Sequence, residues 1–271
     1  MFGHFSLDTY RKLVELLLKE RANVCFEDFP LKDNSKAYLI LRHDVDLSPE
    51  AALRMAELEK NIGVRACYFV LFSSPYYNLL SENYCWFARR LRELGHEVGL
   101  HYDLRAYAAR GERDSWLTLL EEASLLSTLV GKPIRSISMH NPSVSGQDLF
   151  LSRDDFINAY HDRFVKEIGY FSDSGGAWRD ETVHLFETGM LPCQIQLLTH
   201  PIFWVEEAGN RWETLDRFIE SKIGALKNES RLVKELWSKH PAVIQHDKRN
   251  GKLFTAPSLT ASASATSGDS R

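Results

Sequence analysis

The stretch KAYLILRHDVDLSPEAALRMAELEKNIG, residues 36–63, joins a short apolar segment to an amphipathic helical pattern. Residues 36–42 form an apolar run of the length that favours a buried strand. Ser48 is suited to cap the helix that follows, Pro49 to occupy its first turn and Gly63 to end it. The stretch therefore predicts one strand followed by one crossover helix, which is the repeating unit of α/β folds.

The same alternation continues on both sides of this stretch. Further strands are predicted at residues 64–73, 96–101, 134–140, 169–172 and 194–200, and further helices at residues 6–21, 82–95, 115–130 and 153–168. Strands that alternate with helices indicate a parallel sheet or barrel with right-handed connections. We expect about seven parallel strands, and the periodicity alone leaves an open sheet and a closed barrel as alternatives.

The composition is that of a globular protein with one sizeable core. The chain has 271 residues, of which 44% are hydrophobic, and a formal net charge of -4 from interspersed acidic and basic residues. One domain is predicted up to residue 256, because barrels of this length often form a single domain. The mixed charge argues against nucleic acid as a partner. A charged amphipathic helix is predicted at 212–237, and the low-complexity segment 257–271 is expected to be disordered.

The sequence shows neither a targeting signal nor a paired-cysteine motif. The first twenty residues do not have the pattern of a secretory signal, and no apolar run is long enough to span a membrane, so we expect a cytoplasmic protein. Cys25, Cys67, Cys85 and Cys193 are isolated in the sequence and form no CxxC pair. This spacing favours reduced core residues and argues against a zinc cluster built on thiolates.

Polar residues recur at the carboxyl ends of the predicted strands, where parallel α/β folds build their active sites. Asp44 and Asp46 are two residues apart at the end of the first such strand, so their side chains share one face. Two close carboxylates disfavour joint ionisation unless a cation lies between them or one takes a proton. The pair therefore suits a metal ligand beside a general base, although two aspartates that cap the next helix are an alternative.

Histidines end three of the other strands. His101, His140 and His200 each close an apolar run, and neutral imidazole is a common ligand for zinc, iron and nickel. A single strand-end histidine is more often structural. Three histidines and three aspartates at strand ends, in a chain with ten histidines, favour one shared site. His96 begins its strand and is therefore expected to be structural, at the opposite mouth.

The order of these motifs resembles that of the polysaccharide deacetylase (NodB-homology) family, over about Lys36 to Trp204. DVD at 44–46 resembles the family's Asp pair, GHEVGLH at 95–101 its histidine motif, and LLTHP at 197–201 its final motif. Asp173 and Trp178 resemble its Asp-x-x-x-Trp segment with one extra residue. The resemblance implies a distorted (β/α) barrel and metal-dependent removal of an acyl group from a sugar.

The resemblance also implies residue roles. Asp44 becomes the general base, Asp46 and His101 become metal ligands, and His200 becomes the general acid. The chain departs from the family at Arg105, where a second metal-binding histidine is expected. It departs again at His140-Asn141-Pro142, where the family has Arg-x-Pro.

One hypothesis reconciles both departures. His140 replaces the missing ligand, which gives a site of two histidines and one carboxylate with a position left open for water and substrate. Arg42 or Arg105 then holds the base carboxylate. A backbone N–H near Tyr102 supports the developing oxyanion, and Trp178, with Tyr102 and Phe203 or Trp204, forms an apolar wall. The residues predicted to contact substrate are Asp173, Trp178, Tyr102, Arg42 and Arg105.

The expected cofactor is a divalent metal ion, zinc first, with iron, nickel and cobalt as alternatives. The expected substrate is a small carbohydrate with an N-acetyl or N-formyl group, nucleotide- or lipid-linked, in surface polysaccharide assembly. Two rival functions are a non-catalytic barrel that binds a sugar or a partner, and a metal-dependent hydrolase of another amide.

Overall fold

The computed structural model describes residues 3–31, 35–111, 114–146, 148–205 and 209–240. The chain divides into two compact units, Met1–Phe218 and Ile219–Arg271. The segment 257–271 lies outside the described residues, and the prediction of one domain up to residue 256 stays a prediction.

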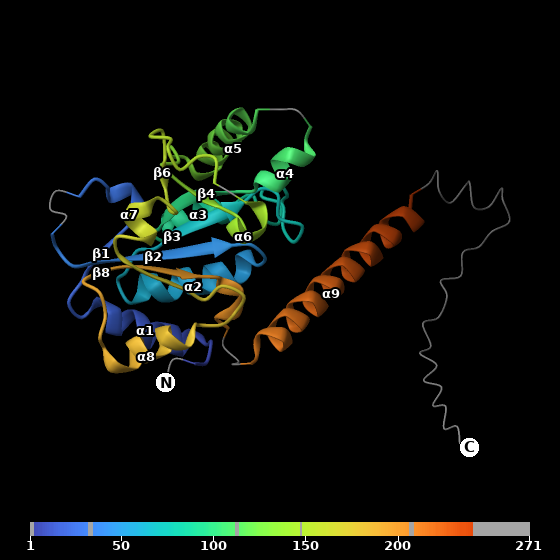
Figure 1. Ribbon diagram of the computed structural model, residues 1–271. Coiled ribbons are helices and arrows are strands. Elements are labelled where there is room, and N and C mark those ends of the chain that lie inside the picture. The colour runs from blue at the N-terminus through green and yellow to red at the C-terminus, as the bar shows by residue number, and fades with distance from the viewer. Residues whose placement is uncertain (1–2, 32–34, 112–113, 147, 206–208, 241–271) are drawn as a thin grey trace, which may run out of the picture. The chain divides into compact units, whose positions relative to one another are not determined.

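The elements follow one another in this order (Figure 1): α1 Leu7–Leu18, β1 Ala22–Val24, η1 Phe26–Asp28, β2 Tyr38–Val45, α2 Pro49–Asn61, β3 Cys67–Leu71, α3 Phe87–Glu93, β4 Glu97–Tyr102, α4 Leu104–Ala109, α5 Ser115–Val130, β5 Ser136–Met139, α6 Pro142–Ser145, β6 Ile157–Asn158, α7 Asp162–Val165, β7 Gly169–Ser172, α8 Asp180–Thr188, β8 Gln194–Thr199, η2 Pro201–Phe203 and α9 Arg211–Ser238.

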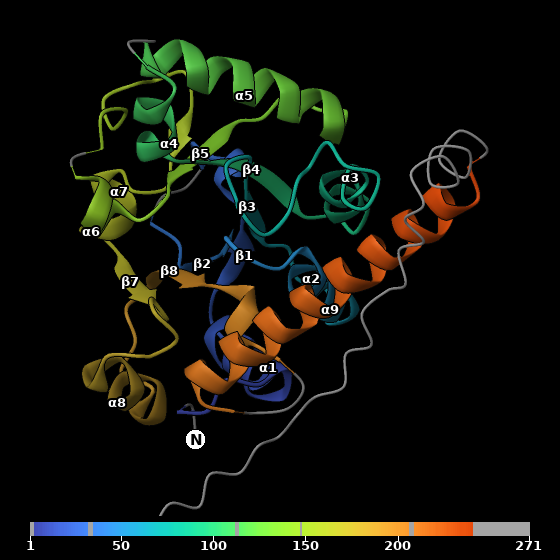
Figure 2. The same cartoon turned by 90° about the vertical axis from the view of Figure 1, so that its right-hand side faces the viewer.

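The strands form one curled parallel sheet in the order β6-β5-β4-β3-β2-β8-β7, with β1 on β2. Every strand pairing is parallel. Helices α1, α2, α3 and α5 contact one another in succession around the outside of the sheet (Figure 2). The fold is therefore a distorted (β/α) barrel, as predicted.

Strand β2 pairs with one strand along one edge and with two strands along the other edge. On one edge it pairs with β8 from Tyr38 to His43. On the other edge it pairs first with β1, along Tyr38 to Ile40, and then with β3, along Arg42 to Val45. Strand β1 therefore ends where β3 begins, on the same side of β2.

Two apolar clusters correspond to the two faces of the sheet. The larger one fills the space between the sheet and the helices and includes Leu39, Leu41, Val70 and Leu100. The smaller one lies on the opposite, inner face and consists of Cys25, Phe26, Phe29, Tyr38, Ile40, Cys67, Phe69, Ala159 and Phe164. Because alternate residues of a strand face opposite ways, the inner face of β2 carries Tyr38, Ile40, Arg42 and Asp44.

The local signals at helix ends are confirmed. Ser6 and Ser48 accept hydrogen bonds from the backbone N–H groups of Thr9 and Ala51 and cap α1 and α2. Gly63 follows α2 with a φ of 76°, a left-handed conformation that suits glycine.

The helix predicted at residues 153–168 is wrong. This segment contains strand β6, which pairs with β5, and the short helix α7. Asn158 also breaks the helical pattern, because its side chain accepts from the Tyr160 N–H and donates to Asp148. Strand pairing and side-chain bonds to the backbone therefore override the apolar spacing. The helix predicted at 82–95 is shorter, since α3 begins at Phe87.

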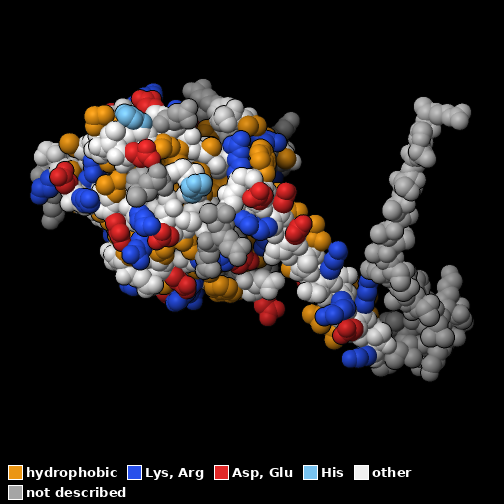
Figure 3. Space-filling model, turned by 90° about the horizontal axis from the view of Figure 1, so that it is seen from below, with side chains coloured by type: hydrophobic (Ala, Val, Ile, Leu, Met, Phe, Trp, Pro, Cys, Tyr) orange, Lys and Arg blue, Asp and Glu red, His pale blue; other side chains and the backbone are white. Residues whose placement is uncertain are grey.

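Acidic and basic side chains are mixed over the face of the molecule in Figure 3. Among the described residues, no helix combines the length and the apolar composition needed to cross a membrane.

Candidate metal centre

Asp46, His101 and His140 converge at the carboxyl ends of β2, β4 and β5. The Asp46 Oδ1 atom lies 3.2 Å from His101 Nε2 and 3.2 Å from His140 Nδ1. The two ring nitrogens are themselves 3.2 Å apart. The three candidate ligand atoms thus form a nearly equilateral triangle, contributed by three strands of one sheet.

The strand register brings the two histidines together. His101 is paired with Ser138, and Tyr102 with Met139, so His140 follows directly at the end of β5. The His140 N–H continues the ladder by donating to the Tyr102 carbonyl at 2.8 Å. Asn141 then adopts a left-handed conformation, with a φ of 46°, and turns the chain into α6. This turn leaves the His140 ring at the edge of the sheet.

The three residues fit a divalent transition metal. Asp46 Oδ1 is buried and has no hydrogen-bond partner among the described residues. Burial raises the pKa of Asp46, but His101 and His140 outweigh it and hold the pKa below its usual range. Ligand atoms 3.2 Å apart are compatible with bonds of about 2.0–2.2 Å from His nitrogen and carboxylate oxygen to one zinc ion.

The tautomers required of the histidines are available. His101 Nδ1 lies 2.9 Å from the Ser138 carbonyl, which accepts a proton from Nδ1 and leaves the Nε2 lone pair facing Asp46. His140 Nε2 lies 3.0 Å from the Asn141 side-chain amide. With the amide oxygen turned toward the ring, Asn141 accepts from Nε2 and leaves Nδ1 free for an ion.

Asp44, the predicted base, forms a two-point ion pair with Arg42. The guanidinium donates from Nε to Oδ1 at 3.0 Å and from Nη2 to Oδ2 at 2.7 Å. Arg42 is fully buried, donates to Ser138 and Gln196, and stacks on Tyr160 with its Cζ 4.2 Å from the ring centroid. Burial raises the pKa of Asp44, but Arg42 and His101 lower it, and the net pKa is below its usual range. The carboxylate is therefore ionised and fixed in orientation.

His200, the predicted acid, is held by Asp173. Asp173 is fully buried and lies 2.6 Å from His200 Nδ1, and it also accepts from the His200 backbone N–H. Trp204 Nε1 donates to the second Asp173 oxygen at 2.7 Å. Burial lowers the pKa of His200, but Asp173, with Asp46 and Asp44, raises it to about 9. The imidazolium thus has Nε2 free, 3.8 Å from Asp46 Oδ2.

All five residues lie at one mouth of the barrel. Asp44, Asp46, His101, His140 and His200 line a single cleft of about 490 Å³. The cleft is completed by side chains from α6, β7, β8, α8 and the segment after β6: Pro142, Ser143, Tyr160, Tyr170, Phe171, Ser172, Arg179, Glu181, Thr182, Leu185 and Leu198 among them.

Several residues predicted to contact substrate lie elsewhere. Among the described residues that line the cleft, Tyr102, Trp178 and Arg105 are missing. Tyr102 is buried and donates to Asp148, while Trp178 packs against Phe5 in a separate pocket. Arg105 is exposed beyond β4 and leaves Arg42 as the partner of Asp44.

The remaining predicted residues have supporting positions. Asp173 lies beneath His200, and Trp204 is buried against Asp173, so neither faces the cleft. His96 is buried at the start of β4, where its ring contacts the Ala56 carbonyl and the Ala66 N–H, as expected of a structural residue.

Sequence reasoning did not identify Tyr160, Tyr170 and Arg179, which line the cleft. Tyr160 was hidden by the wrong helix prediction. Tyr170 lies within a predicted strand, where an aromatic residue is unremarkable in sequence. Arg179 precedes α8 and carries no motif.

Known proteins similar to this chain are found by comparison of structures and not by comparison of sequences. No family model matches the chain, and no curated protein matches its sequence. A solved polysaccharide deacetylase from Bacillus cereus is similar at 13% identity, with 72% of this chain and 89% of that one covered and a TM-score of 0.42.

Two further solved structures are similar to this chain at comparably low identity. A family 4 acetyl xylan esterase from Clostridium thermocellum, in complex with a cobalt ion, has 13% identity, covers 69% of this chain and 84% of its own, and gives a TM-score of 0.42. A CE4 family pseudoenzyme from Bacillus anthracis has 15% identity, covers 71% and 63%, and gives a TM-score of 0.32. The neighbours thus belong to the family that the motifs resemble, and likenesses this distant carry no conclusion about activity.

Proposed function

We propose that this protein hydrolyses an N-acyl amide on a sugar with the help of a divalent metal ion, zinc first among the candidates. One observation carries the proposal: three ligand atoms 3.2 Å apart lie in the same cleft as a fixed carboxylate and a charged imidazole. Metal-dependent hydrolysis needs these components together, because water must lose a proton and the leaving amine must gain one.

Asp46, His101 and His140 would hold the metal. The chemistry that a divalent metal supplies when bound here is polarisation of the amide carbonyl and acidification of a water molecule. Asp44 takes the proton of the attacking water, since its carboxylate is ionised and its two oxygens are oriented by Arg42. The cleft that would receive the substrate is lined in part by residues of α6 and α8.

His200 donates the proton that the departing amine requires. Its Nδ1 is engaged by Asp173, so the proton that leaves is the one on Nε2, which faces the cleft. Asp44 and His200 thereby have the opposed ionisation states that a base and an acid need at neutral pH. Leu198 and Phe171 supply apolar surface for an acyl methyl group.

We favour an N-acetyl or N-formyl sugar with a nucleotide or lipid attachment, in surface polysaccharide assembly. Arg179 at the rim of the cleft offers a positive charge to such an attachment.

The test combines metal content with product detection. The purified protein is expected to hold a metal through this site and to release acetate or formate from N-acyl amino sugars. Asp46→Ala and His101→Ala are expected to lose that metal and turnover together. His184→Ala, which removes an exposed ring on α8, is the matched control and should keep both. Full turnover in an Asp46→Ala variant without metal would contradict the proposal.

The same experiment separates the rival functions. A non-catalytic binding protein would bind a sugar without releasing acid. A hydrolase of another amide, such as a cyclic imide or ureide, would release ammonia or ring-opened product instead.

A further inference from the structure

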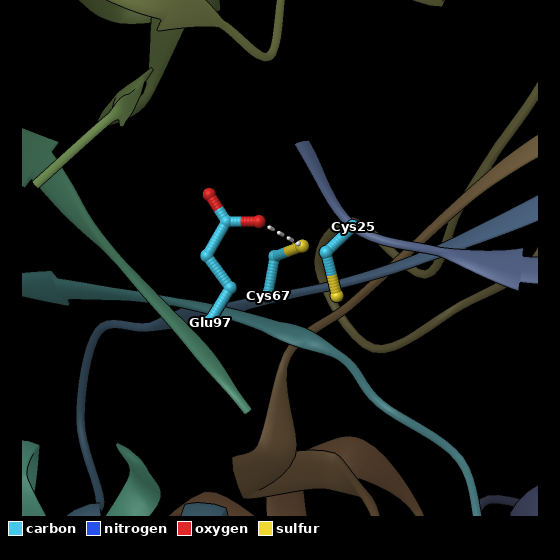
Figure 4. Close-up of side chains that lie close together, drawn as sticks. All are labelled: Cys25, Cys67 and Glu97. Atoms are coloured by element: carbon cyan, nitrogen blue, oxygen red, sulfur yellow. Dashed lines mark hydrogen bonds between the residues drawn. The ribbon is translucent and has the colours of Figure 1, made fainter. Parts of the chain in front are cut away.

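A second group of side chains that could bind a metal lies at the amino ends of β3 and β4, away from the candidate centre. It consists of Cys25, Cys67 and Glu97, hereafter the thiol cluster (Figure 4). Cys25 follows β1, while Cys67 and Glu97 are the first residues of β3 and β4. The sequence separates the two cysteines widely, but β1 ends where β3 begins along β2, and this junction brings them together.

The candidate ligand atoms of the thiol cluster all lie within 4.8 Å of one another. Cys67 Sγ is 3.1 Å from Glu97 Oε2, and Figure 4 shows Glu97 and Cys25 on opposite sides of the Cys67 sulfur. A zinc ion with bonds of about 2.0–2.3 Å holds its ligand atoms about 3–4 Å apart. The spacing of the thiol cluster, at most 4.8 Å, is therefore no more than about 1 Å wider than a zinc ion requires.

Burial isolates the thiol cluster from solvent and from the candidate centre. Cys25 and Cys67 are fully buried, and Glu97 is 2% exposed. The ring of Phe69 covers Gly99, which lies between Glu97 and His101 on the inner face of β4. The two groups thus occupy opposite ends of the barrel interior.

The surroundings of the thiol cluster orient its carboxylate and oppose its ionisation in the absence of a cation. Burial raises the pKa of Cys67 and of Glu97, so a bound cation would compete with protons at both groups. Glu97 is oriented by Ser136 Oγ and by the backbone N–H of Glu27. Nearby, Glu27 and Asp28 are themselves paired with Arg65, at 2.6 and 3.3 Å, so they add little net charge beside the cluster.

We propose that Cys25, Cys67 and Glu97 form a second metal site, which binds zinc through two thiolates and one carboxylate. Two sulfur ligands select a soft or borderline ion over magnesium or calcium. Binding replaces the protons of the cluster and releases them to solvent, so the affinity rises with pH. The ion ties β1, β3 and β4 together at the end of the barrel opposite the cleft.

Cobalt is the probe that separates the two sites, because only thiolate ligands give it strong charge-transfer absorption in the near-ultraviolet. The reduced protein is stripped of metal and titrated with Co²⁺ alone. The full chain is expected to bind two equivalents, and Asp46→Ala one equivalent with the thiolate band intact. Adding Cys67→Ser to Asp46→Ala should abolish both binding and the band. Glu97→Gln in that background is expected to weaken cobalt binding about tenfold or more.

Cys85→Ser is the matched control, because it makes the same atomic change at an exposed cysteine, and it should change nothing. Circular dichroism and the unfolding temperature establish that each serine variant is folded. Absence of a thiolate band in the Asp46→Ala protein at excess cobalt overturns the proposal, whatever the cysteine variants do. A Cys25–Cys67 disulfide in the protein as isolated, detected by mass spectrometry, also overturns it.

Discussion

Each candidate proton-transfer residue has one buried partner of opposite charge. Arg42 engages both oxygens of Asp44, and Asp173 engages the Nδ1 of His200. In each pair the candidate reactive residue lines the cleft and its partner lies behind it. The partners therefore decide the ionisation and orientation of the groups that would react, without touching substrate.

Asp173→Asn tests the charge behind His200. The pKa of His200 is raised to about 9 mainly by the Asp173 carboxylate, against the effect of burial. Activity that needs the protonated ring therefore falls as pH rises through this value. Removing the carboxylate lowers the pKa of His200, so the alkaline limb of the kcat/KM profile is expected to move to lower pH. If the alkaline limb of the kcat/KM profile does not move in Asp173→Asn, His200 is excluded as the general acid.

Arg42→Lys tests the geometry behind Asp44. Lysine keeps the positive charge but loses the two parallel hydrogen bonds of the guanidinium. We expect kcat/KM to fall by about tenfold to hundredfold, because the base is no longer held in orientation. The acid limb should shift to higher pH, since the pKa of Asp44 rises. Unchanged kinetics with a weaker fold would show that Arg42 is purely structural.

At the scale of the elements, β4 connects the two polar ends of the barrel interior. Its residues Glu97, Gly99 and His101 face the same way, and Gly99 is where Phe69 crosses the strand. A Cβ atom on Gly99 would lie 2.4 Å from the Phe69 ring and 2.7 Å from Ser136 Oγ. The absence of a side chain here is required for β3, β4 and β5 to pack.

Gly99→Ala is therefore expected to destabilise the protein by about 1–3 kcal/mol through overpacking. Because β4 must shift, the metal affinity of the His101 site should also fall. Urea unfolding and metal titration measure the two effects. The double variant with Phe69→Leu, which relieves the clash, should recover much of the stability, and no recovery would place the cause elsewhere.

At the scale of the whole molecule, one buried carboxylate joins the helical layer to the sheet. Glu59 of α2 accepts from Tyr10 of α1 and Tyr68 of β3, and it pairs with His43 of β2 at 2.7 Å. All four side chains are fully buried. His43 in turn contacts Thr199 of β8, so the network reaches both strands that carry the candidate base and acid.

Glu59→Ala is expected to cost about 3–5 kcal/mol, since it leaves His43 and two tyrosines without their buried acceptor. Burial raises the pKa of Glu59, but His43 and the other donors outweigh it and the net pKa is lowered. Its contribution to stability is thus present above the unfolded-state pKa and is lost as pH falls through the folded-state pKa. Urea unfolding from neutral to acid pH should show a smaller acid loss in the variant. A cost under about 1 kcal/mol would contradict this role.

The sequence by itself predicted the strands β2, β3, β4, β5, β7 and β8, the longer helices and the residue types of the candidate site, but neither β1 nor β6. The apolar runs, the caps at Ser6 and Ser48 and the stop at Gly63 are local signals, and local signals are legible in sequence. Strand-end position made Asp46, His101 and His140 candidates, because parallel strands put their carboxyl ends at one edge, and the family resemblance led to the hypothesis that they are the metal ligands.

The tertiary structure alone decided which side chains meet. The pairing register and the curvature of the sheet place Arg42, and not Arg105, beside Asp44. They also leave Tyr102 and Trp178 outside the cleft. They also bring Cys25 close to Cys67, although the separation of the two cysteines in the sequence had argued against a thiolate site. Such contacts depend on how distant strands pair and pack, and that information is spread over the whole chain.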